Sequence, residues 1–84
     1  MPIDQLLAHS LNEKIVKEIK AEMARQGLSQ SELGELVGRT QNAISRRLTG
    51  KVQFSMGEIE EIAQALDVTV EQLIPRAKSR RASL

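Results

Sequence analysis

Apolar residues recur along the chain at steps of three and four positions, which is the spacing of one face of an α-helix. No stretch alternates apolar and polar residues for long enough to predict a β-strand. The pattern therefore predicts an all-α fold of five helices joined by short turns. With their capping residues, these helices cover residues 10–27, 29–38, 40–50, 55–66 and 69–75. Their inner faces are expected to include Leu11, Leu36 and Met56.

Capping signals set most of the predicted helix ends. In the capping box Ser-x-x-Glu, each side chain bonds a free backbone N–H at the start of a helix. The chain has three such pairs, which are Ser10 with Glu13, Ser29 with Glu32, and Ser55 with Glu58. Thr40 and Thr69 are expected to begin the third and fifth helices, while Gly27 and Gly38 are expected to end the first and second as left-handed caps.

The 84 residues allow one small domain. We assign this domain to residues 10–75, preceded by an N-terminal segment, residues 1–9. Residues 76–84 form a basic tail with no apolar face, and we expect this tail to be disordered in isolation.

Two short helices separated by a turn occupy residues 30–49. Gly34 lies in the middle of the first, where glycine costs about 1 kcal/mol relative to alanine. We interpret Gly34 as a point of close approach, at which the next helix crosses and leaves no room for a larger side chain. Gly34 and Gly38, four positions apart among apolar residues, are typical of a helix-turn-helix.

The outer face of the third predicted helix carries short or planar polar side chains and no acid, namely Gln41, Asn42, Ser45, Arg46 and Thr49. Gln and Asn pair with adenine at two points, and Arg pairs with guanine in the same way. The alternative is an ordinary solvated face, but such faces favour Glu and Lys, as the first and fourth helices do here. The composition therefore favours contact with DNA bases in the major groove.

Charge is separated along the chain, although the total is only +1. Residues 39–54 contain four basic residues and no acid, whereas residues 55–74 contain five acids and no base. The tail adds four more basic residues. Because phosphates attract the basic segments and not the acidic one, this separation is compatible with binding DNA in one orientation.

Other classes of function find little support in the composition. The chain has no cysteine and a single histidine, His9, so we expect no metal site, no cofactor and no enzymatic activity. Its apolar runs are far shorter than the roughly 20 residues that span a bilayer, so we expect no membrane association.

Several segments, in order, resemble the phage-repressor or Cro-like (xenobiotic-response-element, XRE) helix-turn-helix family. They are residues 28–33, Gly38, residues 41–50 and residues 54–68, and the resemblance spans residues 11–74. It implies a compact, five-helix, lambda-repressor-like domain that binds double-stranded operator DNA. It also implies a homodimer on an inverted repeat and a regulator, most often a repressor, in the cytoplasm of a bacterium or of a phage-infected host.

The resemblance also implies roles for individual residues. Those that read bases are Gln41, Asn42, Ser45 and Arg46. Gln30 contacts a phosphate and braces Gln41, and Thr49 and Lys51 hold phosphate together with neighbouring backbone N–H groups. Arg39 and Arg47 stand where the family often has apolar residues, and we expect both to contact phosphate.

A second hypothesis keeps the same fold but gives it a protein partner. In an antitoxin-like or adaptor module, the acidic face of the fourth and fifth helices, or the N-terminal segment, forms the docking surface. Stable binding of a protein without sequence-selective DNA binding distinguishes this hypothesis from the first.

Overall fold

The computed structural model describes residues 3–74, which form five α-helices and no strand. The helices are α1 (Ile3–Gln26), α2 (Gln30–Val37), α3 (Gln41–Leu48), α4 (Met56–Leu66) and α5 (Val70–Leu73). The predicted all-α fold of five helices is thus confirmed. The basic tail predicted for residues 76–84 lies outside the described residues.

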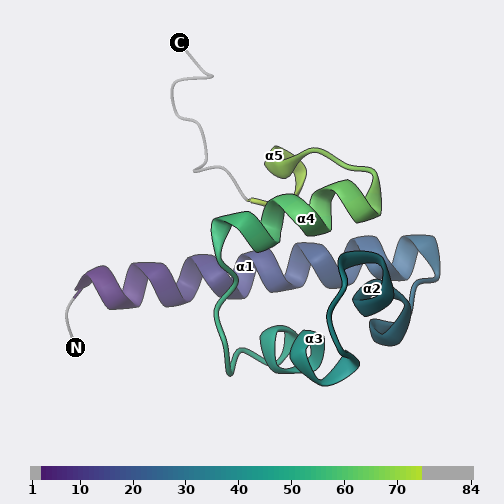
Figure 1. Ribbon diagram of the computed structural model, residues 1–84. Helices are drawn as coiled ribbons and strands as arrows, with labels where there is room; N and C mark the ends of the chain where they lie inside the picture. Colours follow the sequence, from purple (N-terminus) through teal and green to yellow (C-terminus); the bar gives the residue numbers. More distant parts are fainter. Residues whose placement is uncertain (1–2, 75–84) are drawn as a thin grey trace, which may run out of the picture.

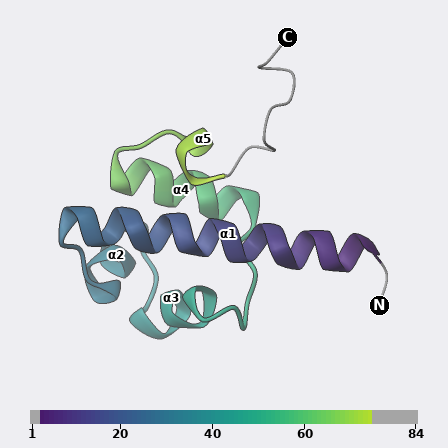
Figure 2. The ribbon, with the colours of Figure 1, turned by 180° about the vertical axis from the view of Figure 1, so that it is seen from behind.

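Helix α1 is the longest element and runs across the whole molecule. Figure 1 shows it behind the other helices, with α4 and α5 above it and α2 and α3 below it, and α2 also packs directly against α4. The view from behind shows the same order, with the N-terminal end of α1 extending past the other helices (Figure 2). As a result, α3 lies at an edge of the molecule, far from α5.

The start of α1 differs from the prediction. The helix begins at Ile3, so Ser10 is an exposed residue inside it, and the predicted N-cap at Ser10 is wrong. A capping box forms only where a helix leaves backbone N–H groups free. No glycine or proline interrupts residues 3–9, so the helix continues through the predicted boundary between residues 9 and 10.

The other predicted caps are confirmed. Ser29 Oγ accepts from the N–H of Glu32 at 3.0 Å, and the Glu32 carboxylate accepts from the N–H of Ser29 at 2.8 Å. The Ser55 and Glu58 pair repeats this arrangement at the start of α4. Thr40 and Thr69 cap α3 and α5, and Gly27 and Gly38 have the expected left-handed φ values of 67° and 72°.

All five helices contribute to one core. The largest fully buried side chains are Ile19, Leu33, Ile44, Leu66 and Leu73. Leu11, Leu36 and Met56 are 43%, 58% and 55% exposed, so their predicted inward placement is wrong. Each lies at the margin of its apolar stripe, and a helical period alone does not tell which margin the neighbouring helices cover.

Two amide side chains of α1 bond to distant backbone groups. Asn12 is buried, and its Oδ1 accepts from the N–H of Phe54 at 3.1 Å. Gln26 Nε2 donates to the carbonyl of Leu66 at 2.6 Å. These bonds fasten the loop before α4 and the C-terminal end of α4 to α1.

Candidate nucleic-acid interface

The turn between α2 and α3 packs directly against α2. A Cβ atom at Gly34 would lie 2.5 Å from the carbonyl oxygen of Arg39, closer than side chains approach backbone. The N–H of Arg39 donates to the carbonyl of Gly34 at 2.8 Å. The predicted close approach at Gly34 is confirmed, but the neighbour is the backbone of the turn rather than α3 itself. This contact sets the direction in which α3 leaves the turn.

Helix α3 has an apolar inner side and a polar outer side. Ile44 and Leu48 are buried in the core. The four predicted base-reading residues lie together on the other side, with Gln41, Asn42 and Arg46 exposed and Ser45 half-buried. Within the part of the chain that the structure describes, the side chains of these four residues form no hydrogen bond or ion pair.

The structure gives Arg47 a partner within the chain. Its Nε and Nη2 donate to the two carboxylate oxygens of Glu58 at 3.1 and 2.9 Å, and its Nη1 donates to the carbonyl of Ala43 at 3.0 Å. Its side chain is only 16% exposed. The hydrogen bonds to Glu58 raise the pKa of the Arg47 guanidinium. Arg47 therefore faces α4 and not the open side of α3.

Arg39 lies on the same side of α3 as Arg47. Its Nη2 is 3.5 Å from the carboxylates of both Glu58 and Glu61. The pKa of Glu58 is lowered, first by the hydrogen bonds from Arg47, then by the bond from the N–H of Ser55 and by the charges of both arginines. Two of the residues expected to contact phosphate thus share one carboxylate at the start of α4.

The loop after α3 uses its backbone N–H groups internally. The N–H groups of Thr49, Gly50, Lys51 and Val52 all donate to carbonyls of α3. Thr49 Oγ1 also donates, to the carbonyls of Ser45 and Arg46 at 2.9 and 3.2 Å. These four N–H groups and the hydroxyl of Thr49 are therefore already engaged within the chain. Lys51 is exposed, and its side chain forms no ion pair among the described residues.

Gln30 occupies the first position of α2, where a helix favours anions. Beside it lies Lys20 of α1, which is exposed and lines the same shallow depression as Ser29, Gln30 and Leu48. The sequence analysis missed Lys20. No local pattern marks this lysine, because its proximity to Gln30 arises only when α1 packs against α2.

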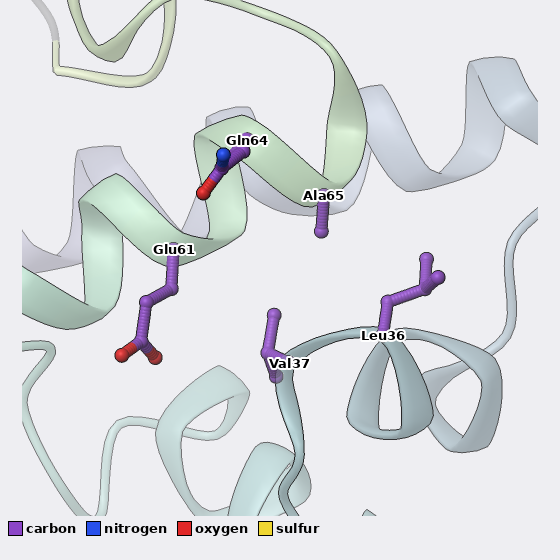
Figure 3. Close-up of a pocket in the computed structure, with 5 residues that line it drawn as sticks. All are labelled: Leu36, Val37, Glu61, Gln64 and Ala65. Atoms are coloured by element: carbon purple, nitrogen blue, oxygen red, sulfur yellow. The ribbon is translucent and has the colours of Figure 1, made fainter.

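A second surface lies between α2 and α4. Leu36 and Val37 of α2 and Ala65 of α4 border a groove, with Glu61 and Gln64 along its α4 side (Figure 3). Leu36 is the most exposed large apolar side chain among the described residues. Glu61 is the acidic residue that lines this groove, and its carboxylate lies 3.5 Å from Nη2 of Arg39.

Searches for other kinds of site gave no candidate. In residues 3–74, no three or more histidine, cysteine, aspartate or glutamate side chains are placed to hold a metal ion. None of the helices described has the length and apolar character of a membrane span.

Comparison with known proteins supplies an independent observation. A helix-turn-helix family model matches residues 19–73, well over half of the chain. The match begins inside α1, contains α2, α3 and α4 completely, and ends at the last residue of α5. A search of curated proteins found no match.

Proposed function

The chain belongs to the Cro-like (XRE) helix-turn-helix family of DNA-binding domains, and we propose that it is a sequence-specific transcriptional repressor that occupies operator DNA. The observation that carries this proposal is the outer face of α3. The amide, hydroxyl and guanidinium groups of Gln41, Asn42, Ser45 and Arg46 have no partner within the described residues, and no acid lies among them. Such groups match the donors and acceptors of base edges in the major groove.

We assign base contacts to Gln41, Asn42, Ser45 and Arg46. Exposure of three of them at an edge of the molecule supports this assignment, since a DNA duplex can approach that edge without meeting α4 or α5. Arg46 is the cation of this group and is suited to pair with guanine at two points.

We assign phosphate contacts to Gln30 and Lys51, and we add Lys20. Thr49 is left out, because its N–H and its hydroxyl already donate within the chain. Lys51 follows α3, and Lys20 and Gln30 line a depression with Leu48 of α3, so these contacts would fix the register of α3 on the DNA backbone.

We further propose that the protein binds an inverted repeat as a homodimer in the cytoplasm of a bacterium or of a phage-infected host. Symmetric half-sites one helical turn apart place α3 of each copy in successive major grooves. Selection of bound sites from random DNA tests this part directly, because half-site spacing is visible in the selected sequences.

Alanine variants of Gln41 and Asn42 test the base-reading assignment. We expect each to lose about 1–3 kcal/mol of affinity for the selected site and none for random DNA. Gln64→Ala is the matched control, since Gln64 is an exposed glutamine on α4. An unchanged preference for the selected site in both α3 variants would refute the assignment.

Lys51→Gln separates phosphate contact from base reading. This variant is expected to weaken binding to all sequences equally and to reduce the slope of log affinity against log salt by about 0.9. A loss confined to the selected site would contradict the role of Lys51.

The groove beside Leu36 favours one second candidate function, an antitoxin-like or adaptor role. An exposed leucine near the exposed carboxylate of Glu61 suits a partner segment that carries an apolar side chain beside a basic one. If this role is the main one, Leu36→Ser abolishes a stable stoichiometric complex and leaves DNA binding unchanged. If the wild-type chain forms no such complex, the second candidate falls.

A further inference from the structure

Glu58 links three parts of the domain through one carboxylate. Oε1 accepts from the N–H of Ser55 at 2.9 Å and from Nε of Arg47 at 3.1 Å. Oε2 accepts from Nη2 of Arg47 at 2.9 Å and lies 3.5 Å from Nη2 of Arg39. The Glu58 side chain is 13% exposed, so water screens these contacts only partly.

The two arginines held by Glu58 are neighbours of the DNA-facing helix. Arg39 directly precedes Thr40, the N-cap of α3, and Arg47 lies in the last turn of α3. In contrast, the side chains of Arg46 and Lys51 are exposed and have no partner in the described part of the chain. Of the four cations between residues 39 and 54, two are therefore engaged within the protein and two are available to DNA.

A guanidinium binds carboxylate and phosphate through the same pair of N–H donors. While Arg47 holds both oxygens of Glu58, the pair formed by its Nε–H and one N–H of Nη2 is not available for a two-point contact with a phosphate. Phosphate contacts strengthen binding to every DNA sequence and carry no sequence information. Freeing these arginines would therefore strengthen binding to random DNA while adding nothing to the reading of bases.

We propose that Glu58 is a positioning residue, which limits the affinity of the domain for the phosphate backbone of every DNA sequence by holding Arg39 and Arg47 in ion pairs within the protein. This inference rests on the proposed sequence-specific function. Glu58 acts through the arginines and does not itself contact DNA.

The test compares Glu58→Gln with Glu60→Gln in the full chain. Both variants remove one negative charge from α4, but Glu60 is exposed and pairs with no residue that the structure describes. Affinity for a random duplex and for the selected operator is measured over a series of salt concentrations. We expect Glu58→Gln to steepen the salt slope by about 0.9 for each arginine that reaches a phosphate, and to raise the affinity for the operator and for the random duplex by the same factor. Glu60→Gln should change neither the slope nor the two affinities.

A double variant identifies the arginine responsible. Adding Arg47→Gln to Glu58→Gln should restore most of the wild-type slope, which a merely structural role of Glu58 would not produce. The single variant Arg47→Gln tests the proposal even if Glu58→Gln fails to fold. The proposal requires that Arg47→Gln and the wild type have the same slope of log affinity against log salt. A fall of about 0.9 in this single variant would mean that Arg47 already contacts phosphate, and would overturn the proposal.

Failure of this inference is distinguishable from failure of the proposed function. If the wild-type chain shows no sequence preference, the proposed function is wrong. If the wild type prefers its operator but Glu58→Gln matches Glu60→Gln in salt slope and in affinity for both duplexes, the function stands and the role of Glu58 is refuted.

Discussion

Two glycines lie inside helices, and their surroundings are opposite. A Cβ atom at Gly34 would lie 2.5 Å from the carbonyl oxygen of Arg39, whereas a Cβ atom at Gly57 of α4 would have no neighbour within 4 Å. Replacing each by alanine gives a matched pair, since both changes add one methyl group to a helix. In open surroundings this change stabilises a helix by about 0.5–1 kcal/mol.

At Gly34 the same change must displace backbone. The obstructing atom belongs to the turn, and the N–H of Arg39 donates to the carbonyl of Gly34, so the turn cannot move without straining this 2.8 Å bond. Overpacking costs about 1–3 kcal/mol, which exceeds the gain in helix propensity. We therefore expect Gly34→Ala to lower the free energy of unfolding by about 1–2 kcal/mol and Gly57→Ala to raise it by about 0.5–1 kcal/mol.

Urea denaturation of both variants measures this difference. In a domain of this size, each kcal/mol shifts Tm by about 4–8 °C, so the two variants should also separate clearly by thermal melting. Gly34→Ala should weaken operator binding as well, because the turn directs α3. If Gly34→Ala is as stable as Gly57→Ala, the turn is not tightly packed against α2 and the reasoning is refuted.

Two further predictions concern the polar contacts that hold the helices. Asn12→Ala leaves the N–H of Phe54 without its acceptor and should lower the free energy of unfolding, measured in urea, by about 1–3 kcal/mol. Asn42 is exposed and has no partner in the described residues, so Asn42→Ala should stay within about 0.5 kcal/mol of the wild type. Equal effects of these two changes would contradict the role of Asn12. The pKa values of Glu32 and Glu58 are lowered in the folded chain, so the stability that they contribute is present above the unfolded glutamate pKa of about 4.3 and is lost as the pH falls through their lower folded values. When Tm is measured from pH 7 to pH 3, it should begin to decrease once the pH drops under about 4.3, and it should decrease less steeply in Glu58→Gln than in the wild type. Identical pH profiles of Tm in the two proteins would contradict the contribution of Glu58.

The features that the sequence predicted correctly are mostly local. A capping box involves residues three positions apart, so Ser29 and Ser55 mark the starts of α2 and α4 without knowledge of the fold. The same local signal failed at Ser10, because spacing cannot show whether the preceding residues are already helical. The close approach at Gly34 was also predictable, since a mid-helix glycine is costly unless space demands it.

The side-chain partners of the site were not predictable from the sequence. Arg46 and Arg47 are adjacent and chemically identical, yet one is exposed and the other bonds Glu58. Which of them turns inward depends on how α3 lies against α4, and packing between helices determines this. Charge counting treated all four cations of residues 39–54 as equivalent, whereas the structure pairs two of them, Arg39 and Arg47, with acids of α4.

The division of α3 into two sides has a consequence for how such a protein can evolve. Ile44, Arg47 and Leu48 hold the helix in place, whereas the outward side chains bond nothing else in residues 3–74. Substitutions at such outward positions usually change stability by less than about 0.5 kcal/mol. Under the proposed function, single mutations at Gln41 or Asn42 therefore give access to new operator preferences and leave the fold intact. A lineage with that function would change which genes it controls without passing through unfolded intermediates.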